Sequence, residues 1–303
     1  DGVQGRPIGQ RTDGPAADTP LDTDDHFEAL RGRLLEGGLR AHVAGQARWL
    51  ADVELRAREI LGCGTPSARR GCDVSVRFMT YALRGLPPHQ VFGQALFAFE
   101  LANQESRMAG VNLVMPEDWY IPMRDYELHM RMYRFLGKAY PGVNVALHAG
   151  ELALGLVPPE ALGQHVRQAI EIGGARRIGH ATDAMHDADP AALLADMARR
   201  RIAVEVIPTS SDVILGITGA RHPLRQFLRA GVPVVIAPDD EGVARSDLTN
   251  EYQRAVEEHG LSYSEIKALS LNSIDCSFLP ADEKARARQR LVAAFEAFEA
   301  RYP

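Results

Sequence analysis

Residues 144–151 read NVALHAGE, an apolar run whose end delivers His148 and Glu151. Five further short runs of β-branched and apolar residues have the same character. Such runs, bounded by turn residues, predict six strands that are buried on both faces. The other five are DVSVRFMTYAL (73–83), AGVNLVM (109–115), RRIGHAT (176–182), IAVEVIPTS (202–210) and VPVVIAPDD (232–240).

Longer stretches with helical spacing separate these strands. Alternation of strand and helix is typical of a parallel sheet, either an open doubly wound sheet or a closed (β/α) barrel. The helical stretches are PPHQVFGQALFAFELANQE (87–105), MRDYELHMRMYRFLGKAY (123–140), PPEALGQHVRQAIEIG (158–173), DPAALLADMARR (189–200) and HPLRQFLRAG (222–231).

Polar clusters decide between the two architectures, because they follow five consecutive strands. An open sheet gathers its functional groups near one switch point, whereas every strand of a barrel contributes to one face. The pattern therefore favours an α/β fold of the barrel type. The clusters are MPED (115–118), HAGE (148–151), HATD (180–183), PTSSD (208–212) and PDDEG (238–242).

Length and composition suit this fold. The chain has 303 residues, of which 46% are hydrophobic and 24% charged, and its formal net charge is −6. The acidic balance and the scattered basic residues argue against a nucleic acid polymer as partner. No apolar run approaches the roughly 20 residues of a membrane span. We expect an irregular arm over residues 1–20 and a single barrel domain over 21–303, helical over 21–62.

Two of the three cysteines, Cys63 and Cys72, bracket a turn-rich loop, CGTPSARRGC. They form either a short disulfide or two free thiols. A disulfide would favour a periplasmic or secreted protein, and a cytoplasmic location is the alternative. Cys276 is typical of a small buried residue.

The polar strand ends offer the ligands of a metal ion. His148, His180 and Asp239 form a mixed nitrogen and oxygen set suited to a catalytic divalent cation, and Glu151 is placed to carry a proton. A single histidine at a strand end is more often a structural hydrogen-bonding residue, and adjacent acids such as Asp239 and Asp240 often cap a helix. Recurrence of such groups after successive strands favours the metal site.

Across residues 74–300 the chain resembles the adenosine deaminase family, and most of all its secreted growth-factor-like and bacterial members. The resemblance implies a (β/α)8 barrel of the amidohydrolase type with one zinc ion per chain. The motifs that carry it, in family order and spacing, are HAGE, RIGHA, EVIPTSSDVI, HPLRQFLRAGVPVVIAPDD, LTNEYQRAV and LNSIDCSFLPADEK.

The resemblance also implies a role for each matching residue. His148 and Asp239 are similar to metal ligands, and Glu151 to the residue that protonates N1 of the purine. His180 resembles the residue that orients and helps to deprotonate the attacking water. The resemblance therefore implies that His180 is not a metal ligand, in contrast to the set of His148, His180 and Asp239 suggested by residue type. Asp240 resembles a residue that holds the attacking hydroxide or the purine N7. Gly150 is expected to contact the substrate.

Three departures from the family pattern bear on function. The family begins with a strand that ends in His-x-His, yet no two histidines of this chain are two residues apart, and the first two barrel strands are missing. We expect the 303 residues to be a fragment or to join separated segments; a genuine deletion is the alternative. Met115 stands where relatives have a glycine that approaches the purine. Glu117 and Asp118 either face the base or cap a helix.

These observations predict zinc-dependent hydrolytic deamination of adenosine or a related 6-aminopurine nucleoside, with an inosine-type product and ammonia. A catalytically silent purine-binding or signalling barrel without metal is one alternative. An amidohydrolase for a different aminopurine is another. The expected partner is a small-molecule purine nucleoside, with neither nucleic acid nor membrane, and the amphipathic helices could support a homodimer.

Overall fold

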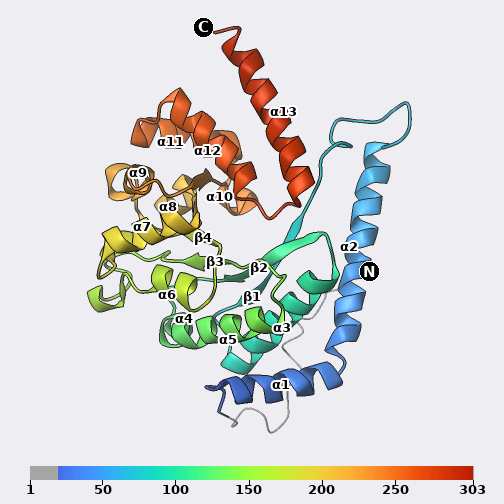
Figure 1. The fold of residues 1–303 in the computed structure, drawn as a ribbon, viewed down its shortest axis with the longest axis vertical. Helices are drawn as coiled ribbons and strands as arrows, with labels where there is room; N and C mark the ends of the chain where they lie inside the picture. The colour runs from blue at the N-terminus through green and yellow to red at the C-terminus, as the bar shows by residue number, and fades with distance from the viewer. Residues whose placement is uncertain (1–19, 303) are drawn as a thin grey trace.

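The computed structural model describes residues 20–302 (Figure 1). The predicted irregular arm therefore lies, apart from Pro20, outside the described residues. The described chain begins with two helices, α1 (Asp24–Glu36) and α2 (Leu39–Leu61). Thr23 caps the start of α1 by accepting a hydrogen bond from the His26 backbone, and α2 ends at Gly62, whose φ of 66° favours glycine.

Six parallel strands follow. Five lie within runs predicted from the sequence, and β2 begins one residue before its predicted run. β1 pairs with β2, and β3, β4, β5 and β6 pair in that order. A bridge between Val111 and Val145 joins β2 to β3, so the strands follow one another in chain order as in a (β/α) barrel. Their bounds are β1 (Phe78–Leu83), β2 (Met108–Val114), β3 (Ala146–Ala149), β4 (Arg177–His180), β5 (Ala203–Val206) and β6 (Val234–Ile236).

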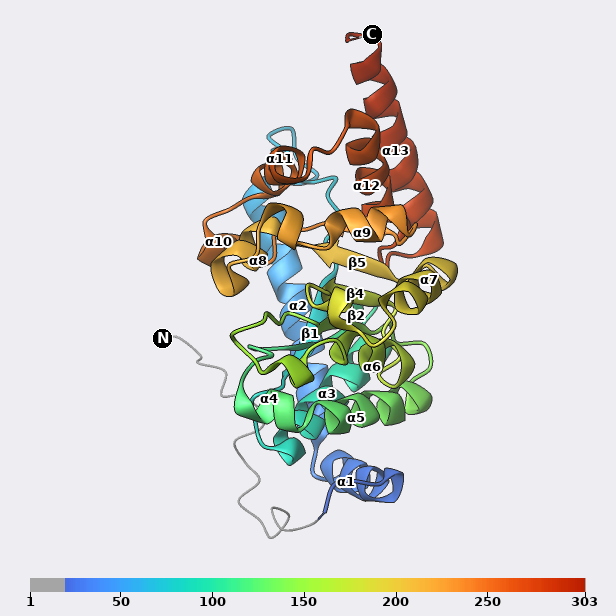
Figure 2. The ribbon, with the colours of Figure 1, turned by 90° about the vertical axis from the view of Figure 1, so that its left-hand side faces the viewer.

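Helices connect the successive strands, and Figure 2 shows α1 and α13 at opposite ends of the molecule. The helices between strands are α3 (Pro88–Gln104), α4 (Tyr120–Arg124), α5 (Tyr126–Ala139), α6 (His165–Glu171), α7 (Pro190–Arg200), α8 (Pro208–Leu215) and α9 (Leu224–Arg229). Those after β6 are α10 (Glu241–Ala244), α11 (Leu248–His259), α12 (Tyr263–Asp275) and α13 (Ala281–Glu299). Short 3-10 turns occur at η3 (Pro159–Ala161), η4 (Ala184–His186) and η5 (Gly219–Arg221).

One hydrophobic cluster links the N-terminal helices to the sheet, and it extends from Leu21 to Leu269. Phe27 of α1 is fully buried and stacks on Phe92 of α3 with ring centroids 5.5 Å apart. It also contacts Phe135 of α5 at 5.6 Å. These aromatic contacts hold α1 against the helices that flank β2.

The sulfur atoms of Cys63 and Cys72 form a disulfide just beyond α2, which decides between the two alternatives for this pair. Cys276 is a free, half-buried thiol at the end of α12. Within residues 20–302, no helix combines the length and the apolar character needed to cross a bilayer.

His129 of α5 is an unusual member of the interior. Its side chain is fully buried, and neither ring nitrogen has a hydrogen-bond partner among the described residues. Burial, with a contribution from the Arg84 charge, lowers its pKa from 6.5 to about 4. The unfolded chain therefore binds more protons between those two values, and this residue costs stability as the pH falls from about 6.5 to about 4.

We expect His129→Leu to stabilise the protein more at pH 5 than at pH 8, by a difference of about 2 kcal/mol, because leucine removes the proton uptake on unfolding. Urea unfolding at the two pH values measures the difference. His42→Leu, at an exposed position of α2, is the matched control. An equal effect of His129→Leu at both pH values would contradict this account.

Candidate active site at the strand ends

Three ionisable side chains converge at the carboxyl ends of the strands. Glu151 lies two residues beyond β3, His180 is the last residue of β4, and Asp239 follows β6. In the β3–β4 ladder Ala149 pairs with His180, which brings the two chain segments side by side. Parallel pairing thus assembles residues that are far apart in sequence.

One ligand atom from each of Glu151, His180 and Asp239 lies within 4.8 Å of the other two. The Nδ1 atom of His180 is 3.5 Å from Glu151 Oε1, and Ser210 donates a hydrogen bond of 3.1 Å to Asp239 Oδ2. His180 and Asp239 have φ angles of 71° and 54°, the left-handed region that is strained for residues other than glycine. Such strain commonly accompanies functional positions.

The unpaired polar atoms of this cluster suit a cation. Both ring nitrogens of His180 and the Oε1 atom of Glu151 are buried without a hydrogen-bond partner among the described residues. Burial raises the pKa of Glu151, although the nearby His180 opposes the shift. Buried polar atoms are costly unless something binds them, and a metal ion accepts histidine nitrogen and carboxylate oxygen together.

His148 lies next to this cluster, with its ring centroid 4.9 Å from that of His180. Its Nδ1 atom is 3.1 Å from Asn112 Oδ1, which also accepts the backbone N–H groups of Leu113 and His148. The two N–H groups identify this atom as the amide oxygen, which can only accept, so we assign the proton to Nδ1 of His148 and the lone pair to Nε2. Burial holds the pKa of His148 well below its usual range, so the ring stays neutral, as a metal ligand requires.

The remaining predicted residues occupy different positions around the cluster. Gly150 has a φ of 75°, and a Cβ atom on it would lie 2.4 Å from Asp183 Oδ1, so only glycine fits. Asp240 is exposed and precedes α10, outside the group of three. Met115 has a φ of 90°, and its side chain packs close to Gly85.

Sequence reasoning missed Arg84 and left the role of Glu117 open. Glu117 is buried, and it accepts hydrogen bonds from the backbone N–H groups of Gly150 at 2.9 Å and Glu151 at 3.0 Å. The cap of α4 is Trp119 and has no side-chain cap hydrogen bond, so the interpretation of Glu117 as a helix cap is wrong. A charged residue directly after an apolar strand, in ALRG (82–85), was the available signal for Arg84.

Despite its burial, the pKa of Glu117 is lowered to about 2 by Arg84 and His165. Arg84 Nη1 lies 3.5 Å from Glu117 Oε2, and His165 Nδ1 lies 2.5 Å from Glu117 Oε1. Both residues of the Arg84–Glu117 pair have fully buried side chains. Buried charged and polar side chains, those of Arg84, Glu117 and His165, therefore adjoin the candidate site.

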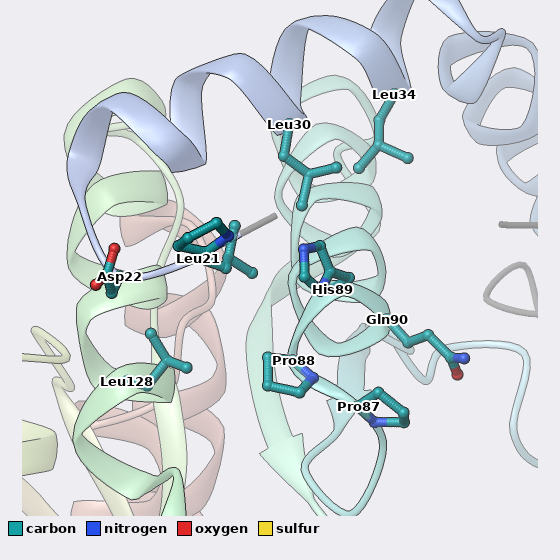
Figure 3. A pocket seen from close by; sticks show the side chains of 10 residues that line it. Leu21, Asp22, Leu30, Leu34, Pro87, Pro88, His89, Gln90 and Leu128 are labelled. Carbon is teal, nitrogen blue, oxygen red and sulfur yellow. The ribbon is translucent and has the colours of Figure 1, made fainter. Parts of the chain in front are cut away.

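A separate apolar pocket of about 510 Å³ lies between α1, α3 and α5. Figure 3 shows Leu30 and Leu34 of α1, His89 of α3 and Leu128 of α5 around it. None of its lining residues belongs to the cluster of Glu151, His180 and Asp239. This pocket is therefore distinct from the candidate active site.

A family model described as adenosine deaminase matches residues 52–294 of this chain. The chain belongs to the adenosine deaminase family. The resemblance inferred from the motifs is thereby confirmed.

The adenosine deaminase of Shewanella loihica (strain ATCC BAA-1088 / PV-4) is 30% identical over 261 residues, which are 86% of this chain and 67% of that protein. The match to the adenosine deaminase of Escherichia coli (strain SE11) is 35% identical over 153 residues, 50% of this chain and 43% of that protein.

Among solved structures, an amidohydrolase from Burkhoderia ambifaria with bound Zn superimposes with a TM-score of 0.62 at 23% identity. The match covers 76% of this chain and 60% of that one. The predicted α/β fold of the barrel type is therefore confirmed. The chain spans about two thirds or less of the length of these members of the adenosine deaminase family and its structural relatives.

Asp239→Ala is expected to weaken Zn²⁺ binding by more than about 100-fold. Changes to residues that only support a metal ligand cost about 10–100-fold in affinity, and loss of a ligand costs more. Asp239 belongs both to the geometric cluster and to the ligand pair implied by the resemblance. Calorimetric titration of metal-free protein with Zn²⁺ measures the affinity. Asp240→Ala, which removes the adjacent carboxylate, is the control. Equal affinities of the parent and Asp239→Ala would exclude Asp239 as a ligand.

Proposed function

We propose that this protein catalyses hydrolytic deamination of adenosine or a related 6-aminopurine nucleoside, giving an inosine-type product and ammonia. The observation that carries the proposal is the convergence of Glu151, His180 and Asp239 at the strand ends, with buried atoms left unpaired. Membership of the adenosine deaminase family supports the reaction class. The reaction replaces an exocyclic amino group by oxygen from water.

The donor set fits one zinc ion per chain. Asp239 and His148 are the ligands that the resemblance implies, and the Nε2 lone pair of the neutral His148 suits that role. The ligand atoms that lie within 4.8 Å of one another belong to Glu151, His180 and Asp239, and this group does not include His148, which lies beside it. In this proposal His180 and Glu151 carry protons next to the ion and are not its ligands. A bound zinc ion supplies hydroxide at neutral pH by lowering the pKa of water.

Glu151 is the proposed proton donor to the purine N1 atom. Burial raises the pKa of its carboxyl group, so a larger fraction stays protonated as the pH approaches neutrality. The unpaired ring nitrogens of His180 allow it to orient the attacking water and to accept its proton. We assign Asp240 to the attacking hydroxide or the purine N7, and Gly150, which admits no side chain, to close contact with the substrate.

Glu151→Gln is expected to lower kcat by about 10²–10⁴-fold, because glutamine cannot donate the proton that makes the ring electrophilic. The loss of adenosine absorbance on conversion to inosine measures the rate, and zinc content is measured in the same samples. Glu160→Gln, at an exposed position after the same strand, is the control. Full activity of Glu151→Gln with zinc retained would remove Glu151 from the mechanism.

A catalytically silent purine-binding or signalling barrel is the second candidate function. No two histidines of the 303 residues are two positions apart, and the family uses such a pair to hold the metal, so zinc binding by this chain is tested directly. Zinc content of the purified chain separates the two candidates. About one tightly bound zinc per chain supports the hydrolase, whereas purine binding without metal supports the silent barrel.

Met115 suggests a third candidate, a different aminopurine substrate. Its side chain lies within reach of Gly85 and its backbone has a φ of 90°, which favours glycine. Trp119 also packs toward Gly85, and it is half exposed. A methionine held in this conformation narrows the space that a glycine would leave open.

Met115→Gly is expected to change the ratio of kcat/KM values between adenosine and other 6-aminopurines by at least about 10-fold, because the pocket gains the volume of a side chain. A panel of adenine, adenosine and N6-substituted nucleosides measures that ratio. Met185→Gly, at an exposed position after β4, is the control. Identical preferences of the parent and Met115→Gly would show that this position does not govern substrate choice.

A further inference from the structure

We propose that Glu117 is a positioning residue that fixes the orientation of Glu151, and that Arg84 in turn fixes Glu117. The inference rests on the proposed function, because it assumes that Glu151 delivers a proton to the substrate. Glu117 itself contacts neither metal nor substrate in this proposal. It acts through the backbone of the turn that follows β3.

The central observation is that one carboxylate binds two consecutive backbone amides. Glu117 Oε1 accepts from Gly150 N at 2.9 Å, and Glu117 Oε2 accepts from Glu151 N at 3.0 Å. Two bonds from one planar group fix the orientation of both peptide units as well as their position. Since the side chain of Glu151 starts from the second of these units, its direction depends on Glu117.

Arg84 connects the carboxylate of Glu117 to the backbone of β2 and β3. Its Nη2 atom donates to the carbonyl oxygens of Leu113 at 2.8 Å and His148 at 2.9 Å, at the ends of β2 and β3. Its Nη1 atom faces Glu117 Oε2 at 3.5 Å. The guanidinium thus ties Glu117 to the strand that carries His148.

His165 secures the other oxygen of Glu117. Its Nδ1 atom lies 2.5 Å from Glu117 Oε1, and its ring stacks on Tyr126 with centroids 3.5 Å apart. The Tyr126 hydroxyl donates to the His165 carbonyl at 3.0 Å. Glu117 is therefore held by an arginine directly after β1, a histidine from α6 and two amides of the turn after β3.

Energetics favour a positioning role over a purely stabilising one. A buried ion pair gains little or no net stability over well-packed apolar residues, because removing both charges from water is costly. Here the buried pair is Arg84–Glu117, and Glu117 binds the backbone of the turn that carries Glu151. A rigidly held side chain improves catalysis, since misplacement of a reacting group by about 1 Å can cost on the order of 100-fold in rate.

The test compares Glu117→Gln with the parent in two measurements. Glutamine replaces one carboxylate oxygen by an NH₂ group, which cannot accept, so it cannot keep the arrangement in which each oxygen accepts from a different amide. We expect kcat to fall on the order of 100-fold with KM changed by less than about 3-fold. We also expect faster hydrogen exchange of the Gly150 and Glu151 amides, while exchange in β5 stays as in the parent.

Glu100→Gln is the matched control, because Glu100 is also a buried glutamate with two hydrogen-bond donors, Tyr140 and Gln104, but lies in α3 away from the site. It is expected to change neither kcat nor exchange at Gly150. A second variant, Glu117→Asp, keeps the charge but is too short to reach both amides. It should lie between the parent and Glu117→Gln in both measurements, and it replaces Glu117→Gln if that variant does not fold.

Unchanged exchange at Gly150 and Glu151 in the Glu117 variants would overturn the proposal, and so would lost protection with an unchanged kcat. An equal loss of kcat in Glu100→Gln would also overturn it, because the effect would then be general destabilisation. A parent without deaminase activity refutes the proposed function instead. Hydrogen exchange then decides by itself whether Glu117 holds the turn.

Discussion

Parallel pairing is the constraint on which the site depends. Since all six strands run in one direction and in chain order, their carboxyl ends lie at one edge. Glu151, His180 and Asp239 lie at or just beyond the ends of three of these strands and meet there, although Glu151 and Asp239 are 88 positions apart in the sequence. The apolar interior holds the strands, and the strand ends are free to carry polar groups without weakening the core.

Next to the cluster at the strand ends lies a second group of charged and polar side chains, Arg84, Glu117 and His165. All three lie at or near zero exposure. Both oxygens of Glu117 accept hydrogen bonds, and Nη2 of Arg84 donates to two carbonyl groups, whereas Nε and Nη1 of Arg84 have no hydrogen-bond partner among the described residues. In the cluster itself, His180 and Glu151 have buried atoms with no partner among the described residues. Geometry therefore separates two roles: the carboxylate of Glu117 holds the backbone of the turn after β3, and the unpaired atoms of His180 and Glu151 lie in the cluster proposed to bind a cation and a substrate.

Much of the barrel could be predicted, because the spacing of apolar residues along the chain differs between strands and helices. Five of the six strands fall within the apolar runs and β2 departs from its run by one residue, and the cluster at HAGE, HATD and PDDEG follows from reading the residues at the end of each run. The role of Glu117 could not be predicted. An acid between Pro116 and Asp118 has the local pattern of a cap. That role is excluded only by the tertiary structure, in which Trp119 is the cap of α4 and the carboxylate accepts from the Gly150 amide.

The sequence by itself determined the order of elements, the family and the candidate residues at the strand ends, because these depend on local periodicity and on motifs. Tertiary structure alone decided which of those residues meet, that Asn112 sets the tautomer of His148, and that Arg84 and Glu117 lie beneath them. The physical reason is that hydrogen bonds and ion pairs between strands depend on the register of segments distant in the chain, which no local pattern encodes.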